Sequence, residues 1–310
     1  MGNWQMGGVF LITEKKYLNL HRILLWALVA IYTLALPHAI FVYNAITKHF
    51  SASIAENIPV YILVLFGITY IAVGFIKKKP FRCIGFILPG AIIAYAVVSY
   101  EPNPNKHIHL PEYVLMTWIL FAAISLDYRG KGMFILVFLC SSLLGIVDEL
   151  QQGIHPYRHY GLWDMGLNSI ASFIGILTLS GLKKKPAGDW NWISYINERS
   201  KLMALLIFGT VGATLTCKYF FTVAANKTFW ASYPIWLVGW NSLYIILCPA
   251  MFLFHIRRHH AFAPAPSDDR FSNQPDPRIT VYLWINTLLS IFFAMHVLAV
   301  FTAISGWEFG

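Results

Sequence analysis

Polar and ionisable side chains gather at three places in an otherwise apolar sequence. One group precedes and begins an apolar run, the second ends the next run, and the third lies in the following loop and at the start of a further run. The candidate site residues in these groups are Lys106, His109, Glu112, Asp148, Glu149, Gln152, Arg158, Asp164 and Asn168. Carboxylates at a membrane boundary are costly and need partners. The groups could therefore bind a polar head group, or perform acid–base chemistry on one.

Residue type and spacing leave several interpretations of these groups open. His109, Glu112 and Tyr113 are three and four residues apart and so share a helix face. The plainest interpretation is a hydrogen-bonded network that pins three helices together. The others are a ligand-binding site and a membrane hydrolase that uses Glu149 or Asp148 with His109. A metal site is not expected, because no standard ligand spacing occurs among His107, His109, His155 and His159.

A single histidine, His296, interrupts the last apolar run. It lies 18 residues after Arg278, which is about 27 Å along a helix and places it near the edge of the hydrocarbon. Trp307 follows 11 residues later, on the same face if the helix continues that far. A neutral imidazole in a membrane helix can be the axial ligand of a metal macrocycle, and an indole N–H can donate to a carbonyl. The alternative is an interhelical hydrogen bond and an ordinary interfacial tryptophan.

The composition determines what kind of protein must position these residues. Of 310 residues, 57% are hydrophobic and only 12% are charged, whereas a soluble domain has about 25% charged residues. The chain is therefore predicted to be an all-α, polytopic membrane bundle surrounded by lipids. The net charge of +9 would suggest nucleic acid in a soluble protein, but here no nucleic-acid partner is expected. The four cysteines form no CxxC pair and are expected to pack in apolar surroundings.

Nine apolar runs approach the length of about 20 residues that a membrane helix needs. They cover approximately 23–43, 59–76, 81–99, 112–126, 132–149, 163–182, 202–224, 233–255 and 279–303. Pro37 and Pro249 are expected to kink the first and the eighth of these helices.

The loops alternate in positive charge. One set of alternate loops holds 18 Lys and Arg residues and the other set holds four. Because cytoplasmic loops carry the excess of positive charge, the N-terminus is predicted to be cytoplasmic and the C-terminus periplasmic. This topology puts all three polar groups, His296 and Trp307 at the outer side of the membrane.

Composition also divides the chain into five predicted parts. Residues 1–80 hold two spans, 81–187 form a four-span bundle, and 188–260 hold two further spans. The aromatic stretch 188–201 is expected to lie flat at the membrane interface. Residues 261–275 are a cytoplasmic Pro-rich linker, and 276–310 form the last helix.

Four sequence blocks around the polar groups resemble the VanZ-like membrane family. They are KHIHLPEY (106–113), GIVDELQQ (145–152), Arg158 followed by LWDMGLN (162–168), and Gly175. The family has an Asp before the Lys, where this chain has Asn105. The resemblance covers spans three to six and implies a four-span fold with a polar outer cluster. Since VanZ is associated with glycopeptide (teicoplanin) resistance, it also implies an envelope protein that binds a lipid-linked or glycopeptide-type head group.

The last helix resembles the alpha polypeptide of the purple-bacterial core light-harvesting antenna. Asp276, Pro277 and Arg278 match its cytoplasmic motif, and His296 and Trp307 match its later residues and both intervals. Ser305 and Gly306 replace a bulkier pair. The resemblance implies that His296 ligates the magnesium of bacteriochlorophyll a and that Trp307 hydrogen-bonds the pigment's acetyl group. A carotenoid is a further candidate cofactor.

The leading prediction is a pigment-binding subunit of a light-harvesting and reaction-centre complex. Its partners would be antenna alpha and beta polypeptides and reaction-centre subunits, in the bacterial inner (intracytoplasmic photosynthetic) membrane. The bundle would make structural contacts. No catalytic residue is predicted, because excitation transfer needs a held pigment and not an acid or a base. The VanZ-like envelope protein stays open as the alternative.

Overall fold

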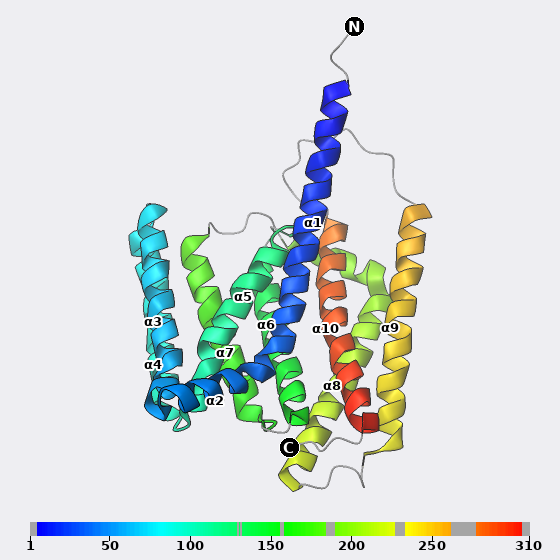
Figure 1. The fold of residues 1–310 in the computed structure, drawn as a ribbon. Helices are drawn as coiled ribbons and strands as arrows, with labels where there is room; N and C mark the ends of the chain where they lie inside the picture. Colours follow the sequence, from blue (N-terminus) through cyan, green and yellow to red (C-terminus); the bar gives the residue numbers. More distant parts are fainter. Residues whose placement is uncertain are drawn as a thin grey trace.

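The chain folds into a bundle of long helices (Figure 1). The computed structural model describes residues 5–128, 130, 132–155, 158–183, 190–226, 233–261 and 277–305. These residues form helices and short 3-10 turns and no strand. The elements are α1 Gln5–Ala35, η1 Leu36–His38, α2 Ala39–His49, α3 Ala52–Ile76, α4 Pro80–Tyr100, η2 Pro104–Ile108, α5 His109–Ile124, α6 Met133–Ile154, α7 Leu162–Leu182, η3 Asn191–Arg199, α8 Ser200–Asn226, α9 Ile235–Ala261 and α10 Pro277–Ser305.

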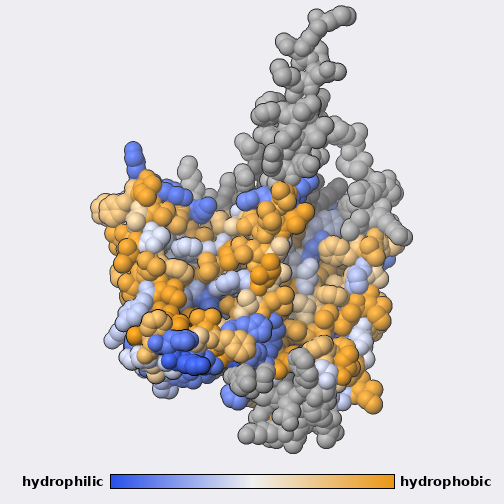
Figure 2. All heavy atoms as spheres, in the orientation of Figure 1, coloured by the Kyte–Doolittle hydropathy of each residue, from blue (hydrophilic) through white to orange (hydrophobic). Residues whose placement is uncertain are grey.

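The predicted class, an all-α polytopic membrane protein, is confirmed. Within the described ranges, nine helical segments are long and apolar enough to cross a membrane. Large apolar side chains cover the flank of the molecule seen in Figure 2. Phe81 on α4 is 88% exposed and Ile76 on α3 is 79% exposed. Such exposure is unfavourable in water and favourable in lipid.

The first predicted span bends where the sequence indicates. α1 ends at Ala35, a 3-10 turn holds Pro37, and α2 then crosses one end of the bundle (Figure 1). Proline lacks an amide hydrogen and disfavours helix in the residue before it, so the kink predicted at Pro37 is confirmed. The last residues of the predicted span 23–43 therefore belong to α2 and not to the crossing helix.

The centre of the bundle is built from α5, α6 and α7, of which α7 packs against α4, α5 and α6. Gly175 permits a close approach of α7 to α5, because a Cβ there would lie 2.7 Å from the Cβ of Thr117 on α5. The Thr117 hydroxyl lies 3.1 Å from that of Ser141, which lies 2.7 Å from that of Ser172. Small residues and interhelical hydrogen bonds are the usual means of joining helices in lipid.

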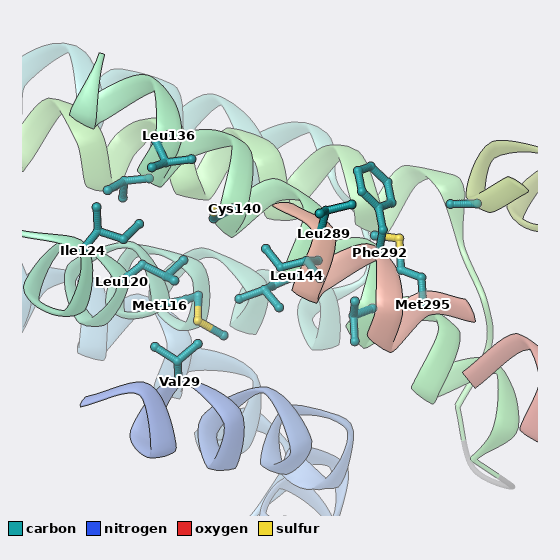
Figure 3. Packing of buried hydrophobic residues seen from close by; sticks show 14 of the residues in the cluster. Val29, Met116, Leu120, Ile124, Leu136, Cys140, Leu144, Leu289, Phe292 and Met295 are labelled. Carbon is teal, nitrogen blue, oxygen red and sulfur yellow. The ribbon is translucent and has the colours of Figure 1, made fainter. Parts of the chain in front are cut away.

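The last helix is an integral part of this bundle. α10 packs against α6, α8, α9 and η3. Figure 3 shows apolar side chains from four helices in one core: Val29 on α1, Met116, Leu120 and Ile124 on α5, Leu136, Cys140 and Leu144 on α6, and Leu289, Phe292 and Met295 on α10. The predicted linker lies outside the described residues, apart from Ala261 at the end of α9.

The aromatic stretch predicted to lie flat at the membrane interface packs in part on α8 and α10. It contains η3, whose Trp192 is only 8% exposed. The Trp192 ring stacks on Trp284 of α10 with ring centroids 5.0 Å apart. The Trp192 ring is therefore buried against protein, whereas Trp190 is 42% exposed and Ile193 is 47% exposed. That the stretch lies flat at the membrane interface stays a prediction.

The two ends of the bundle differ in their charged groups. At one end Arg22 donates to Asp127 at 3.0 Å, and Lys79 and Arg82 donate to the carbonyls of Leu182 and Ser180. The opposite end holds α2, the predicted polar groups and the last turn of α10 (Figure 1). This arrangement agrees with the alternation of charge along the chain. Which end faces the cytoplasm stays a prediction.

Cysteine labelling from outside the cell tests that orientation. Lys77 and Ser53 are exposed at opposite ends of α3. We expect a membrane-impermeant maleimide to label Ser53→Cys in intact cells and to label Lys77→Cys only after the membrane is opened. The reversed pattern would invert the topology. Labelling of both positions from the same side would contradict the fold. The parent chain with its four cysteines is the background control.

Candidate functional site

The three predicted polar groups meet at one end of the bundle. His109 and Glu112 come from the start of α5, and Asp164 and Asn168 from the start of α7. The last turns of α6 supply the remaining carboxylates, and η2 and the loop after α6 supply the two cations. We call the nine residues the polar cluster: Lys106, His109, Glu112, Asp148, Glu149, Gln152, Arg158, Asp164 and Asn168.

The end of α6 differs from the prediction. The predicted span stops at residue 149, whereas α6 continues to Ile154. Asp148 and Gln152 lie one turn apart, and the Gln152 amide donates to Asp148 Oδ2 at 3.0 Å. Because both side chains are buried and satisfy each other, the helix continues through residues that hydropathy alone places at its exit.

One half of the polar cluster is a chain of hydrogen bonds. The Tyr113 hydroxyl donates to Asp148 Oδ2 at 3.1 Å, the same oxygen that accepts from Gln152. Arg158 donates to Gln152 Oε1 from Nε at 2.9 Å and from Nη2 at 2.6 Å. The guanidinium is thus fixed by the buried carboxylate through a single glutamine.

The other half joins η2 to α7, and α6 to the residue that precedes α7. Lys106 Nζ lies 2.9 Å from Asp164 Oδ1. The backbone N–H of Gly161 donates to Glu149 Oε2 at 3.0 Å. The predicted neighbours His109 and Glu112 are 3.8 Å apart at their closest atoms, which is beyond a hydrogen bond.

Sequence reasoning missed one buried carboxylate beside the cluster. Glu101 is 8% exposed and accepts from the Trp163 indole at 2.6 Å and from the Asn103 backbone at 3.0 Å. Its own carbonyl lies 3.0 Å from His107 Nε2. Glu101 follows α4 in an irregular turn, where no periodicity marks a residue as buried.

Several buried polar atoms of the cluster have no hydrogen-bond partner. Among the described residues they include His109 Nδ1, Asp148 Oδ1, Glu149 Oε1 and Asn168 Oδ1. The described hydrogen bonds of the Asp148 and Glu149 side chains go to Tyr113, Gln152 and Gly161. None of these direct bonds reaches His109. The hydrolase alternative allows contact through one water, and a ligand atom of His109 lies within 4.8 Å of one of Glu149.

A cavity of about 200 Å³ adjoins the polar cluster. Its walls come from α2, α3 and η2 and are almost wholly apolar. The lining residues are Ala39, Ile40, Val42, Tyr43, Ile46, Ala55, Ile58, Pro59, Ile62, Pro104, Asn105, Ile108 and Arg158. Arg158 belongs to both the cavity wall and the polar cluster.

His155 packs against η1 and α2 at this end of the bundle. Its ring packs edge-on against His38 at 5.5 Å and Phe41 at 5.4 Å between centroids. Burial lowers the pKa of His155 below its usual value, and the charges of His38 and Arg158 lower this pKa further. The neutral form of His155 is therefore favoured, and Arg158 is the cation of the cavity wall.

His296 lies elsewhere, in the interior of the bundle. Its side chain is fully buried, and the ring stacks on Tyr244 of α9 with centroids 4.1 Å apart. Nδ1 lies 2.7 Å from the Phe292 carbonyl and must donate to it, because a carbonyl only accepts. A neutral imidazole then has its lone pair on Nε2, which has no hydrogen-bond partner. This is the tautomer that a metal ligand needs.

The space in front of Nε2 is filled by α8 and α9. A Cβ at Gly212 would lie 2.8 Å from His296 Nε2 and 2.4 Å from Trp240 Nε1. A cavity of about 870 Å³ borders α10, but His296 is not among its lining residues. The ligand atom therefore suits bacteriochlorophyll, whereas the tetrapyrrole ring does not fit at Nε2 in this arrangement. Trp307 and Asp276 lie outside the described residues.

Comparisons with known proteins name no relative for this arrangement. No family model, curated protein or solved structure matches the chain. The geometry of the polar cluster and of His296 is therefore the basis for a functional proposal, together with the sequence resemblances.

Replacing Tyr113 by Phe tests whether the hydrogen-bond chain holds the helices together. Tyr113→Phe removes one donor from buried Asp148 and should lower the free energy of unfolding by about 1 kcal/mol, since interhelical hydrogen bonds in membranes contribute roughly 0.6–1.7 kcal/mol. The measurement is detergent-induced unfolding. Tyr95→Phe is the matched control, because Tyr95 is 75% exposed. Equal stability of both variants would show that this bond contributes nothing.

Proposed function

We propose that the chain binds the head group of a lipid-linked envelope molecule at the rim of the polar cluster, where Arg158 borders the apolar cavity. One observation carries this proposal: the same guanidinium, that of Arg158, lines an apolar cavity and is fixed by the buried cluster. An apolar cavity with a cation at its border matches a molecule with a hydrocarbon chain and an acidic head group. The role is also the one that the VanZ-like resemblance implies.

The chemistry of the rim favours a phosphate-containing head group. A guanidinium offers five N–H donors in a planar fork that suits phosphate oxygens. Two of the Arg158 nitrogens donate to Gln152, which orients the fork without neutralising its charge. Lys106 and Asn105 are neighbouring polar groups on η2. The aliphatic walls of α2 and α3 then accept part of the chain of the lipid.

We propose binding and not hydrolysis. A general base must lie within hydrogen-bond reach of its partner, directly or through one water. The described partners of Asp148 and Glu149 are donors that hold the carboxylates in place, and His109 is not one of them.

Lipid binding to Arg158→Gln tests this proposal. The probe is a polyprenyl phosphate in phosphatidylcholine nanodiscs. Hydrogen bonds to charged groups contribute about 1.5–3 kcal/mol, so we expect Arg158→Gln to weaken binding by roughly 10- to 100-fold. Arg82→Gln is the matched control, because Arg82 donates to Ser180 at the opposite end of the bundle. Binding by Arg158→Gln that equals wild type, or no preference of wild type for the probe, would refute the proposal.

A second candidate function rests on His296. Its buried imidazole presents an unpartnered Nε2 in the tautomer that ligates metals, and the sequence intervals resemble the antenna alpha polypeptide. In this candidate the protein belongs to a photosynthetic membrane and contacts antenna alpha and beta polypeptides and reaction-centre subunits. Because α8 and α9 cover Nε2, this candidate requires an arrangement in which both helices lie apart from His296.

Absorption spectroscopy tests the second candidate. The chain is produced in a host that makes bacteriochlorophyll a and is purified in mild detergent. Pigment binding predicts near-infrared absorption that His296→Leu abolishes. His49→Leu, an exposed histidine at the end of α2, is the control and should keep the pigment. A colourless wild-type protein, or pigment that survives His296→Leu, would exclude His296 as the ligand.

A further inference from the structure

Three side chains of metal-ligating type converge inside the polar cluster. One ligand atom from each of His109, Glu149 and Asp164 lies within 4.8 Å of the other two. The residues come from α5, α6 and α7 and are up to 55 positions apart in the sequence. The group is therefore made by the fold and corresponds to no local motif.

Burial and unpaired atoms distinguish this group from an exposed acidic patch. His109, Glu149 and Asp164 are 2%, 0% and 8% exposed. Glu149 is held through Oε2 by the Gly161 amide, while Oε1 has no partner. His109 Nδ1 is also buried without a hydrogen-bond partner. Buried groups in this condition are rare, because each loses its interaction with water without compensation.

The charge of the polar cluster points to a cation. Its carboxylates are Glu112, Asp148, Glu149 and Asp164, and its cations are Lys106 and Arg158. With all groups ionised the sum is −2. A net negative charge in a low-dielectric interior is strongly unfavourable. Either two of the carboxyl groups bind protons or one divalent cation neutralises the sum, and only the cation also gives both the unpaired oxygen and the unpaired nitrogen atoms a partner.

We propose that His109, Glu149 and Asp164 bind a first-row divalent transition cation of the Zn²⁺ or Mn²⁺ type. One imidazole and two carboxylates are ligands that these ions accept, whereas Mg²⁺ and Ca²⁺ prefer oxygen alone. In a tetrahedral site with bonds of about 2.0–2.2 Å the ligand atoms lie about 3.3–3.6 Å apart. The three atoms, which now lie within 4.8 Å of one another, therefore have to approach by at most about 1.5 Å to hold an ion. Three protein ligands leave a coordination position open. Cation binding at these three residues needs no lipid and is independent of head-group binding at Arg158.

Lys106 competes with such a cation for the carboxylate of Asp164. Its amine lies 2.9 Å from Asp164 Oδ1 and occupies one oxygen of a proposed ligand. Removing this amine should therefore strengthen cation binding, whereas a purely structural ion pair predicts only a loss of stability.

Titration of the full chain with Zn²⁺ or Mn²⁺ alone tests the site. The protein is purified in detergent without added lipid, treated with a chelator and titrated by calorimetry. We expect one ion per chain. Loss of an outer-shell partner weakens metal sites by about 10–100-fold, so Glu149→Gln should weaken binding by about 100-fold or more. Glu56→Gln on α3 is the matched control, and Lys106→Gln should bind more tightly than wild type.

The outcomes separate the cation site from the lipid site. Arg158→Gln should keep cation binding even where it loses the polyprenyl phosphate. Should Glu149→Gln fail to fold, pulsed electron paramagnetic resonance of Mn²⁺-loaded wild type provides a readout without any variant. Coupling to one imidazole nitrogen supports the site. Absence of binding by wild type, binding unchanged by Glu149→Gln, or absence of nitrogen coupling would overturn it.

Discussion

The arrangement of the bundle depends on one constraint: polar groups inside a membrane must find partners within the protein. The Thr117, Ser141 and Ser172 hydroxyls satisfy one another at the contact of α5, α6 and α7. Nearer the end of the same helices, Tyr113 and Gln152 satisfy one oxygen of Asp148. These bonds fix how the three helices are rotated, and so they place the residues that α5, α6 and α7 contribute to the polar cluster.

The same constraint separates the cluster into an interior and a rim. In the interior, carboxylates outnumber cations, and His109 Nδ1 and Glu149 Oε1 lack partners. At the rim, Arg158 is held by Gln152 and borders the apolar cavity that α2 and α3 enclose. α2 can cover the cluster because the chain turns at Pro37 and because His155 packs on His38 and Phe41. The rim suits an anionic head group and the interior suits a cation.

Much of the fold, and the position of the polar groups at one end of the bundle, could be predicted from the sequence. Low charge and apolar runs predict the nine membrane-spanning segments found among the described residues, and alternating spans bring the three polar groups to one end. The grouping of His109, Glu149 and Asp164 was not predictable, because it depends on the rotation of three helices packed through Gly175 and the buried hydroxyls. The direction in which the His296 side chain points could not be predicted from the sequence either. Apolar residues occur on every face of α10, so the sequence does not show which face packs against other helices. The contacts of α10 with α8 and α9 determine that the imidazole of His296 lies inside the bundle.

The central claim is that the polar cluster is a binding site and not merely a network that joins helices. An experimental density map of the protein purified with its native lipids tests this claim most directly. The account predicts elongated density in the cavity beside Arg158, and a compact peak among His109, Glu149 and Asp164. A map in which protein side chains fill the cavity, and in which the carboxylates of the cluster meet only one another and protein donors, would contradict it.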